Sequence, residues 1–307
     1  MKKAISVILL SVIICITSAA LSGCLYMSYS QERQGPAMWI VEDKDGNRCY
    51  LFGTVHTAKN ADMYPFADVI EDAYSYCKYI AVEYDVTAPE GSGDLKQFEY
   101  TDGTTVKDHL SSETYEAAVS AVRIYEGEYD GKYDKYVPAY WYSLIDSYNT
   151  INNGYSDEYG SDSYFINKAK NDGKDVFEIE GAAKQTEITL SLSDTVMDYF
   201  ISQASKNRGS TGLDYYDAVY KEGSMDLLSY SVNSSKNAQY GSAALNVAMS
   251  EYYDIMFTQR NNALALAVKK CLADKDRVFF ALSISRLVGE DGVVSVLQSS
   301  GYRVVRK

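Results

Sequence analysis

The chain contains only two histidines, and one of them, His56, stands where it could do chemistry. It comes shortly after the apolar run Tyr50–Phe52, which has the composition of a β-strand. Two acids, Glu83 and Glu180, close two further runs of this kind. One imidazole together with carboxylates at neighbouring strand ends could hold a divalent metal ion or perform acid–base catalysis.

These residue types are also compatible with a purely structural role. A lone histidine in a chain is commonly part of the packing, and acids are frequent at strand ends. The second histidine, His109, lies in a polar stretch before Ser111-Ser112, and we expect it at the surface. Spacing alone therefore leaves catalysis and structure open for His56, Glu83 and Glu180.

Strands alternating with helices must position these side chains. Met38–Glu42 and Arg48–Phe52 flank a loop that contains Gly46, a pattern that predicts a β-hairpin. Similar apolar runs predict strands over residues 79–84, 175–180, 277–283 and 302–305. Helical spacing and helix start signals predict helices over residues 66–77, 112–125, 138–150, 162–171, 182–205, 213–222, 242–272 and 289–299. Residues 88–103, rich in Gly, Ser and acids, are expected to form an exposed loop.

This order of elements predicts an α/β fold. Its central sheet should be mixed because the opening hairpin is antiparallel, and helices should flank it. A mostly helical insertion is expected between Glu83 and Asp175. In open α/β sheets, ligands bind beyond the carboxyl ends of the strands, which is where His56, Glu83 and Glu180 are predicted to lie.

The N-terminus has the pattern of an export signal. Two lysines precede the apolar stretch Ala4–Ala20, and Leu21-Ser22-Gly23-Cys24 closes it with small residues. This ending resembles the lipobox of bacterial lipoproteins, which implies that Cys24 becomes the lipidated first residue of the mature chain. We therefore predict a signal peptide over residues 1–23, a tether over 24–36 and a folded domain over 37–307. The predicted location is the extracytoplasmic face of a bacterial membrane, whereas an ordinary signal peptide or an uncleaved anchor is the alternative.

The amino-acid composition indicates which classes of binding partner and metal site are unfavourable for this protein. Loss of residues 1–23 would remove two lysines and no acid, so the net charge would change from −13 to −15. Such a surface argues against nucleic acid, which selects Lys and Arg. The 29 tyrosines suggest either a carbohydrate-binding or adhesive face or, as we favour, the composition of amphipathic helices. Beyond Cys15 and Cys24, three cysteines remain, and their spacing fits no metal site of the CxxC kind.

A resemblance to a known family covers residues 38–305. Met38-Trp39-Ile40-Val41 and Tyr50-Leu51-Phe52-Gly53-Thr54-Val55-His56 resemble the opening of the TraB/GumN family, which includes the TIKI proteases. Later segments that resemble the family in the same order are Ile80–Asp85, Gly160–Phe165, Val176–Glu180 with Gln185, Tyr220–Asp226, Arg260-Asn261, Leu287–Val293 and Gly301–Val304.

The resemblance implies two Gly-x-x-His motifs that build a metal-dependent hydrolytic site. The first is intact as Gly53-Thr54-Val55-His56. At the second, Ser283-Ile284-Ser285-Arg286 stands where Gly-x-x-His is expected. Arg286 is cationic and has no lone pair for a metal ion.

Two functions follow from the resemblance. In the first, the protein is a metal-dependent hydrolase, such as a peptidase, that binds Mn²⁺, Co²⁺ or Zn²⁺ through His56 and Glu83. Arg260, assisted by Asn261, would then orient a substrate carboxylate or stabilise an oxyanion. In the second, the protein is a catalytically inactive family member that binds a ligand or a protein at the cell surface. Arg286 would then pair with Glu83 or another acid in place of the lost ligand.

Overall fold

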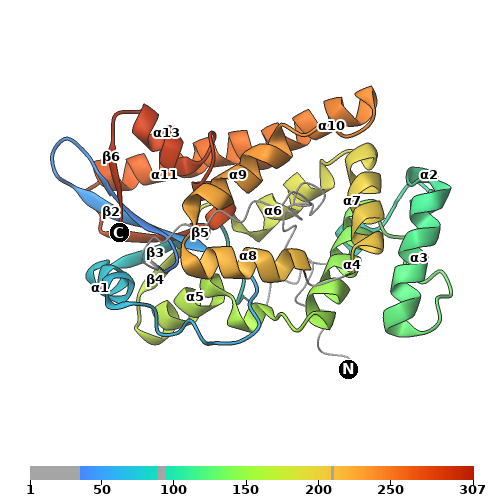
Figure 1. Ribbon diagram of the computed structural model, residues 1–307, viewed down its shortest axis with the longest axis horizontal. Helices are drawn as coiled ribbons and strands as arrows, with labels where there is room; N and C mark the ends of the chain where they lie inside the picture. The colour runs from blue at the N-terminus through green and yellow to red at the C-terminus, as the bar shows by residue number, and fades with distance from the viewer. Residues whose placement is uncertain (1–34, 89–94, 209–210) are drawn as a thin grey trace.

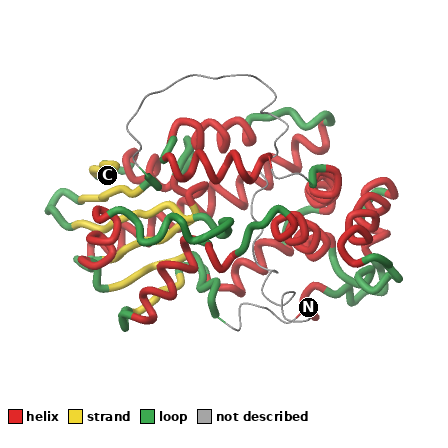
Figure 2. Tube along the Cα trace, turned by 60° about the horizontal axis from the view of Figure 1, so that its bottom comes forward, coloured by secondary structure: helices red, strands yellow, loops and turns green. Residues whose placement is uncertain are grey.

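The computed structural model describes residues 35–88, 95–208 and 211–307 (Figure 1). The predicted signal peptide, Cys24 and nearly all of the predicted tether lie outside the described residues. Within the described ranges, no helix combines the length and the apolar character that a membrane crossing needs. The strands gather at one end of the molecule, and the other end consists of helices and loops (Figure 2).

The sheet has six strands in the order β4-β3-β5-β2-β1-β6. Their bounds are β1 Met38–Glu42, β2 Arg48–Thr54, β3 Tyr79–Val82, β4 Asp175–Glu178, β5 Val278–Ser283 and β6 Arg303–Arg306. Strand β1 runs antiparallel to both β2 and β6, whereas β2, β5, β3 and β4 are parallel to one another. The prediction of a mixed α/β sheet opened by a hairpin is therefore confirmed.

The parallel strands bring their carboxyl ends to one edge of the sheet. Thr54 at the end of β2 pairs with Ser283 at the end of β5. Val82 at the end of β3 pairs with Ala281 of β5 and with Glu178 of β4. The segments that leave these four strands therefore begin close to one another.

Helices cover both faces of the sheet. On one face lie α1 (Asp68–Tyr76) and α5 (Ser161–Asn171). The other face packs against α8 (Thr211–Glu222), α9 (Met225–Lys236), α11 (Arg260–Ala273), α12 (Ile284–Leu287) and α13 (Val293–Ser299). Because β5 is covered on both faces, its residues are almost all apolar, and Val278 to Leu282 are all buried.

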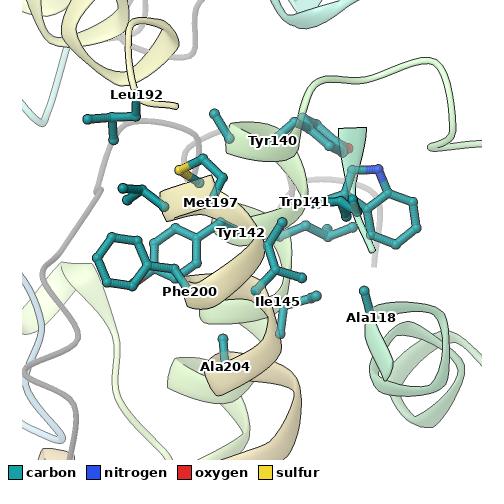
Figure 3. Close-up of a cluster of buried hydrophobic side chains, with 14 of the residues drawn as sticks. Ala118, Tyr140, Trp141, Tyr142, Ile145, Leu192, Met197, Phe200 and Ala204 are labelled. Atoms are coloured by element: carbon teal, nitrogen blue, oxygen red, sulfur yellow. The ribbon is translucent and has the colours of Figure 1, made fainter. Parts of the chain in front are cut away.

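A separate hydrophobic core holds the helical end together. It joins α3 (Ser112–Glu126), α4 (Pro138–Asn152), α7 (Asp194–Lys206) and α10 (Ala243–Tyr253), with the short helix α2 (Val106–His109) beside them. Trp141 and Tyr142 of α4 point into this core with Met197 and Phe200 of α7 (Figure 3). Helix α4 is buried on nearly all sides, as expected of a central helix.

Four tyrosines of this helical end donate hydrogen bonds to two half-buried acids. Glu126 accepts hydrogen bonds from the hydroxyls of Tyr133 and Tyr148 and pairs with Lys132. Asp134 accepts hydrogen bonds from Tyr115 and Tyr129 at 2.9 and 2.6 Å, and its other oxygen lies 2.7 Å from the Lys107 ammonium. We call these residues the tyrosine network: Lys107, Tyr115, Glu126, Tyr129, Lys132, Tyr133, Asp134 and Tyr148.

The structure divides two predicted long helices. The helix predicted over residues 182–205 consists of α6 (Gly181–Leu190) and α7, and the Ser193 hydroxyl caps α7 by accepting from the Val196 N–H. The helix predicted over residues 242–272 is interrupted between α10 and α11 by a π-helical turn, Asp254–Gln259. Helix α9 was not predicted.

The structure qualifies two surface predictions. Residues 95–98 of the predicted exposed loop form a 3₁₀ turn whose Phe98 is buried in the helical core. His109 is only a quarter exposed, because its ring stacks on Tyr100 and its Nδ1 lies 2.7 Å from an oxygen of Asp194.

Candidate functional site

The backbone that carries His56 is fixed between β2 and α5. The Val55 N–H donates to the Ser161 hydroxyl at 2.9 Å, and the Ser161 N–H donates to the Val55 carbonyl at 2.9 Å. Gly160 touches the same turn: a Cβ atom there would lie 2.3 Å from the His56 carbonyl oxygen. Only glycine permits this approach, so Gly160 is needed where the turn meets α5.

Asp162, in the first turn of α5, orients the His56 ring. One of its oxygens makes a very short contact with His56 Nδ1, and the other accepts a hydrogen bond from the Ser163 N–H at 2.8 Å. Burial favours the neutral imidazole, but the Asp162 charge and its hydrogen bond outweigh burial and raise the pKa of His56. With Nδ1 held by Asp162, the other ring nitrogen, Nε2, has no hydrogen-bond partner within the described residues.

Gly53 and Tyr220 place the first motif against the second. The Tyr220 hydroxyl donates to the Gly53 carbonyl at 2.8 Å and lies 3.1 Å from the Ser161 hydroxyl. A Cβ atom on Gly53 would lie 2.4 Å from the Ile284 side chain, so glycine is what lets α12 approach β2. The two tetrapeptides, Gly53–His56 and Ser283–Arg286, thus leave adjacent strands side by side.

The acids predicted at the strand ends meet at Arg260, the first residue of α11. Its Nη2 donates to Glu83 at 3.0 Å and to Glu180 at 2.6 Å, and its Nε donates to the second oxygen of Glu180 at 2.8 Å. Gln185 of α6 adds a further hydrogen bond to Glu180. All three charged side chains are more than nine-tenths buried. Burial opposes the charge of Arg260, but its bonds to Glu180 and the charge of Glu83 raise its pKa.

Arg286 enters the same group of charges with fewer partners. Its Nε lies 3.6 Å from Glu83, and the centre of its guanidinium lies 5.1 Å from the centroid of the Phe257 ring. Its Nε and Nη1 are buried and have no hydrogen-bond partner in residues 35–88, 95–208 and 211–307. Burial, followed by the charge of Arg260, lowers the pKa of Arg286 to about 10, so the side chain stays cationic at neutral pH. We call Glu83, Glu180, Arg260 and Arg286 the charged cluster.

The π-helical turn supplies two of the contacts of this cluster. Phe257 within the turn packs on Arg286, and Arg260 directly after it binds the two glutamates. π-Helical turns are rare and occur often at functional sites. Here the turn places the Phe257 ring and the Arg260 guanidinium, three residues apart in the sequence, at the charged cluster.

Asn261 does not join the charged cluster through any hydrogen bond. Its side-chain amide donates to the Asp291 carbonyl at 2.9 Å, while its buried side-chain oxygen has no partner in the described part of the chain. Asn261 thus fastens α11 to the loop before α13. Its predicted assistance to Arg260 stays a prediction.

The donor set does not fit the divalent metal ion that the motif implies. No three His, Cys, Asp or Glu side chains converge as metal ligands anywhere in residues 35–88, 95–208 and 211–307. Glu83 already accepts from Arg260 and from the Ser283 N–H at 2.9 Å, and Arg286 faces one of the same oxygens. Burial raises the pKa of Glu83, but the charges of Arg286 and Arg260 outweigh it, so the pKa is lowered and Glu83 is anionic because of those two arginines. Metal binding by His56 and Glu83 stays a prediction.

The sequence predicted that the two glutamates lie at this edge of the sheet, but it did not indicate two other residues of the site. Glu83, Glu180, Arg260 and Arg286 meet as the strand ends suggest. Asp162 and Phe257 were not singled out. The Gly-x-Asp segment Gly160-Ser161-Asp162 was a signal for the first, and nothing in the spacing marked the second.

Comparison with known proteins identifies one similarity. A family model described as the TraB/PrgY/gumN family matches residues 37–306. The match spans all six strands and the helical end. A search of curated proteins gave no match, and neither did a search of solved structures.

Proposed function

The chain belongs to the TraB/PrgY/gumN family, and from that premise we propose that it is a catalytically inactive, lipid-anchored member that acts as a ligand-binding module outside the cell. In this proposal, the guanidinium of Arg286 takes the place of the metal ion. The family fold is kept, and the site at the strand ends binds rather than hydrolyses.

The position of Arg286 against Glu83 carries this proposal. A metal ion would have to displace Arg260, Arg286 and the Ser283 N–H from Glu83, the carboxylate predicted to bind it together with His56. It would also enter a site with two buried guanidinium groups, which repel a cation. Both effects reduce the affinity for a divalent metal.

Metal-dependent hydrolysis is the second candidate, and one observation favours it. A carboxylate that holds the far nitrogen of a histidine is the usual support of a metal-ligating imidazole, and Asp162 holds His56 in this manner. A bound metal would polarise a carbonyl or acidify a bound water. The same pairing equally orients a histidine that binds a ligand directly.

Metal content and titration with Mn²⁺, Co²⁺ and Zn²⁺ separate the two candidates. The full-length protein, purified in detergent, is compared with His56→Ala and Arg286→His. We expect no stoichiometric metal in the wild type and a gain of binding in Arg286→His, which restores the second imidazole. Metal bound by the wild type and lost in His56→Ala would instead establish the hydrolase candidate.

The anchor is a separate part of the proposal and has its own test. Leu21-Ser22-Gly23-Cys24 supports lipidation at Cys24. Cys24→Ala should release the protein from the membrane fraction, whereas Cys271→Ala, which changes a half-buried thiol far along the chain, should not. Retention of Cys24→Ala in the membrane fraction would refute lipid anchoring.

A further inference from the structure

Arg286 has buried hydrogen-bond donors that are not used. The side chain is 4% exposed, and both Nε and Nη1 lack an acceptor within the described residues. A buried donor without a partner costs about 1–3 kcal/mol, and more when the group is charged. An oxygen atom from outside the chain would remove this cost.

The neighbouring acids cannot supply that oxygen. Glu83, the closest, is 3.6 Å from Nε and already accepts from Arg260 and Ser283. Glu180 is held by Arg260 and Gln185. The ring of Phe257 lies against the guanidinium and offers no hydrogen-bonding oxygen.

His56 adds a second hydrogen-bonding side chain beside Arg286, and its Nε2 donates when the ring is protonated. Asp162 fixes its Nδ1, and its side chain is 23% exposed, far more than those of the charged cluster. Its Nε2 has no hydrogen-bond partner of its own in the described part of the chain. Because Thr54 pairs with Ser283, the segments that carry His56 and Arg286 leave paired strand ends, and Glu83 lies 3.6 Å from Arg286 at the same edge of the sheet.

We propose that Arg286 and His56 bind a carboxylate group of a small extracytoplasmic ligand. This rests on the proposed function, because it requires that no metal ion occupies the site. Arginine and histidine form their strongest hydrogen bonds with such anionic oxygens. Two guanidinium groups and a protonated imidazole balance the charges of Glu83, Glu180 and Asp162, so a singly charged carboxylate adds less excess negative charge to the site than a doubly charged phosphate. Arg260, whose Nε and Nη2 already donate to the two glutamates, is not the anion-binding residue.

The two-histidine composition allows a direct test on the full-length protein in detergent. With ¹³C-labelled histidine, each ring gives its own NMR signal, and His109→Ala assigns them. The probes are acetate, N-acetylalanine as a peptide-type carboxylate and glucuronate as a sugar-type carboxylate. N-acetylalanine amide, which lacks the carboxylate, and inorganic phosphate are the controls.

We expect a saturable shift of the His56 signal in the millimolar range with one or more carboxylates, and at least about tenfold weaker binding of the amide and of phosphate. The His109 signal, whose two ring nitrogens contact Asp194 and Thr104, should not move. Preference for N-acetylalanine or for glucuronate would identify a peptide-type or a sugar-type ligand. Equal shifts with the amide, or shifts of both histidines, would overturn the proposal.

Variants of Arg286 make the test specific. Arg286→Met and Arg286→Lys should each weaken carboxylate binding about tenfold or more, because neither offers guanidinium donors. Arg123→Met, which removes an exposed arginine of α3, should leave it unchanged. Unchanged binding in both Arg286 variants would refute the proposal, and Arg286→Lys keeps the test valid if the Met variant does not fold.

Metal analysis of the same samples separates this inference from the proposed function. Stoichiometric metal in the wild type would refute the proposed function. A metal-free wild type whose His56 signal responds to no carboxylate would refute only the carboxylate site.

Discussion

The tyrosine network and the charged cluster are both partly or fully buried polar groups, but they differ in how completely they are satisfied. In the tyrosine network, both oxygens of Glu126 and of Asp134 have partners at short distance. In the charged cluster, Arg260 donates three hydrogen bonds to the two glutamates, whereas Arg286 keeps two buried donors without an acceptor among the described residues.

This difference indicates that the tyrosine network stabilises the fold and that the charged cluster is the better candidate for a ligand site. A polar network in which every member is paired stabilises and defines the packing around it. A network with an unpaired member is costly, and in a native protein the unpaired group needs an explanation such as a ligand. The tyrosines of the tyrosine network therefore have a structural role, whereas the ligand binding that we propose depends on Arg286 and His56.

The largest effect should come from removing Arg260. Arg260→Met would leave Glu83 and Glu180 buried with only Arg286 and neutral donors to balance them. Breaking a buried ion pair on one side costs about 3–5 kcal/mol, so the free energy of unfolding should fall by about that amount in urea titrations. Arg123→Met, at an exposed site, should change it by less than about 0.5 kcal/mol. A similarly small effect of Arg260→Met would show that the charged cluster does not hold α11 to the strand ends.

An intermediate effect should come from the tyrosine network. Glu126→Ala removes the acceptor of two tyrosine hydroxyls and the partner of Lys132, which should lower the free energy of unfolding by about 1–3 kcal/mol. Glu128→Ala, an exposed acid two residues along the chain, is the matched control and should be nearly neutral. If the two variants were equal, the network would contribute nothing measurable and the comparison would fail.

The same carboxyl group should make stability depend on pH. Burial raises the pKa of Glu126, but the hydrogen bonds from Lys132, Tyr133 and Tyr148 outweigh burial and lower it. A lowered pKa in the folded state adds stability above the unfolded-state value of about 4.3, and this stability is lost as the pH falls through the folded-state value. The difference in unfolding free energy between wild type and Glu126→Gln should therefore shrink as the pH is lowered from 7 to about 3. Glu113→Gln, at a side chain that is 81% exposed, should show a much smaller change, and a constant difference for Glu126→Gln would contradict the assignment.

The sheet and the approach of the acids were predictable because they depend on local patterns. Apolar runs that end in an acid predict strands, and parallel strands bring their ends together, which is why Glu83 and Glu180 meet. The hairpin followed from two strands around a glycine-containing loop. These features need no knowledge of distant contacts.

The features that the sequence did not predict depend on contacts between segments that are distant along the chain. Asp162 reaches His56 across 106 residues, and the burial of Phe98 depends on helices that the spacing does not place in space. The π-helical turn is a one-residue change in helical phase that leaves no clear periodic signal, so Phe257 could not be assigned to the site. Whether Arg286 is satisfied is likewise decided by three-dimensional distances to Glu83 rather than by residue type.

The smallest effect on stability should come from Arg286→Met, although it lies beside Arg260 in the same cluster. Glu83 would keep Arg260 and the Ser283 N–H as partners, and the variant would remove two unsatisfied donors. The lost contact with Phe257 is worth about 0.5–2 kcal/mol. These terms oppose each other, so the free energy of unfolding should change by no more than about 1 kcal/mol in either direction, as for other buried charges replaced by apolar groups. A loss as large as that of Arg260→Met would mean that Arg286 is a structural ion-pair partner. A small change together with lost carboxylate binding would show that Arg286 is kept for its ligand and that its neighbour is kept for the fold.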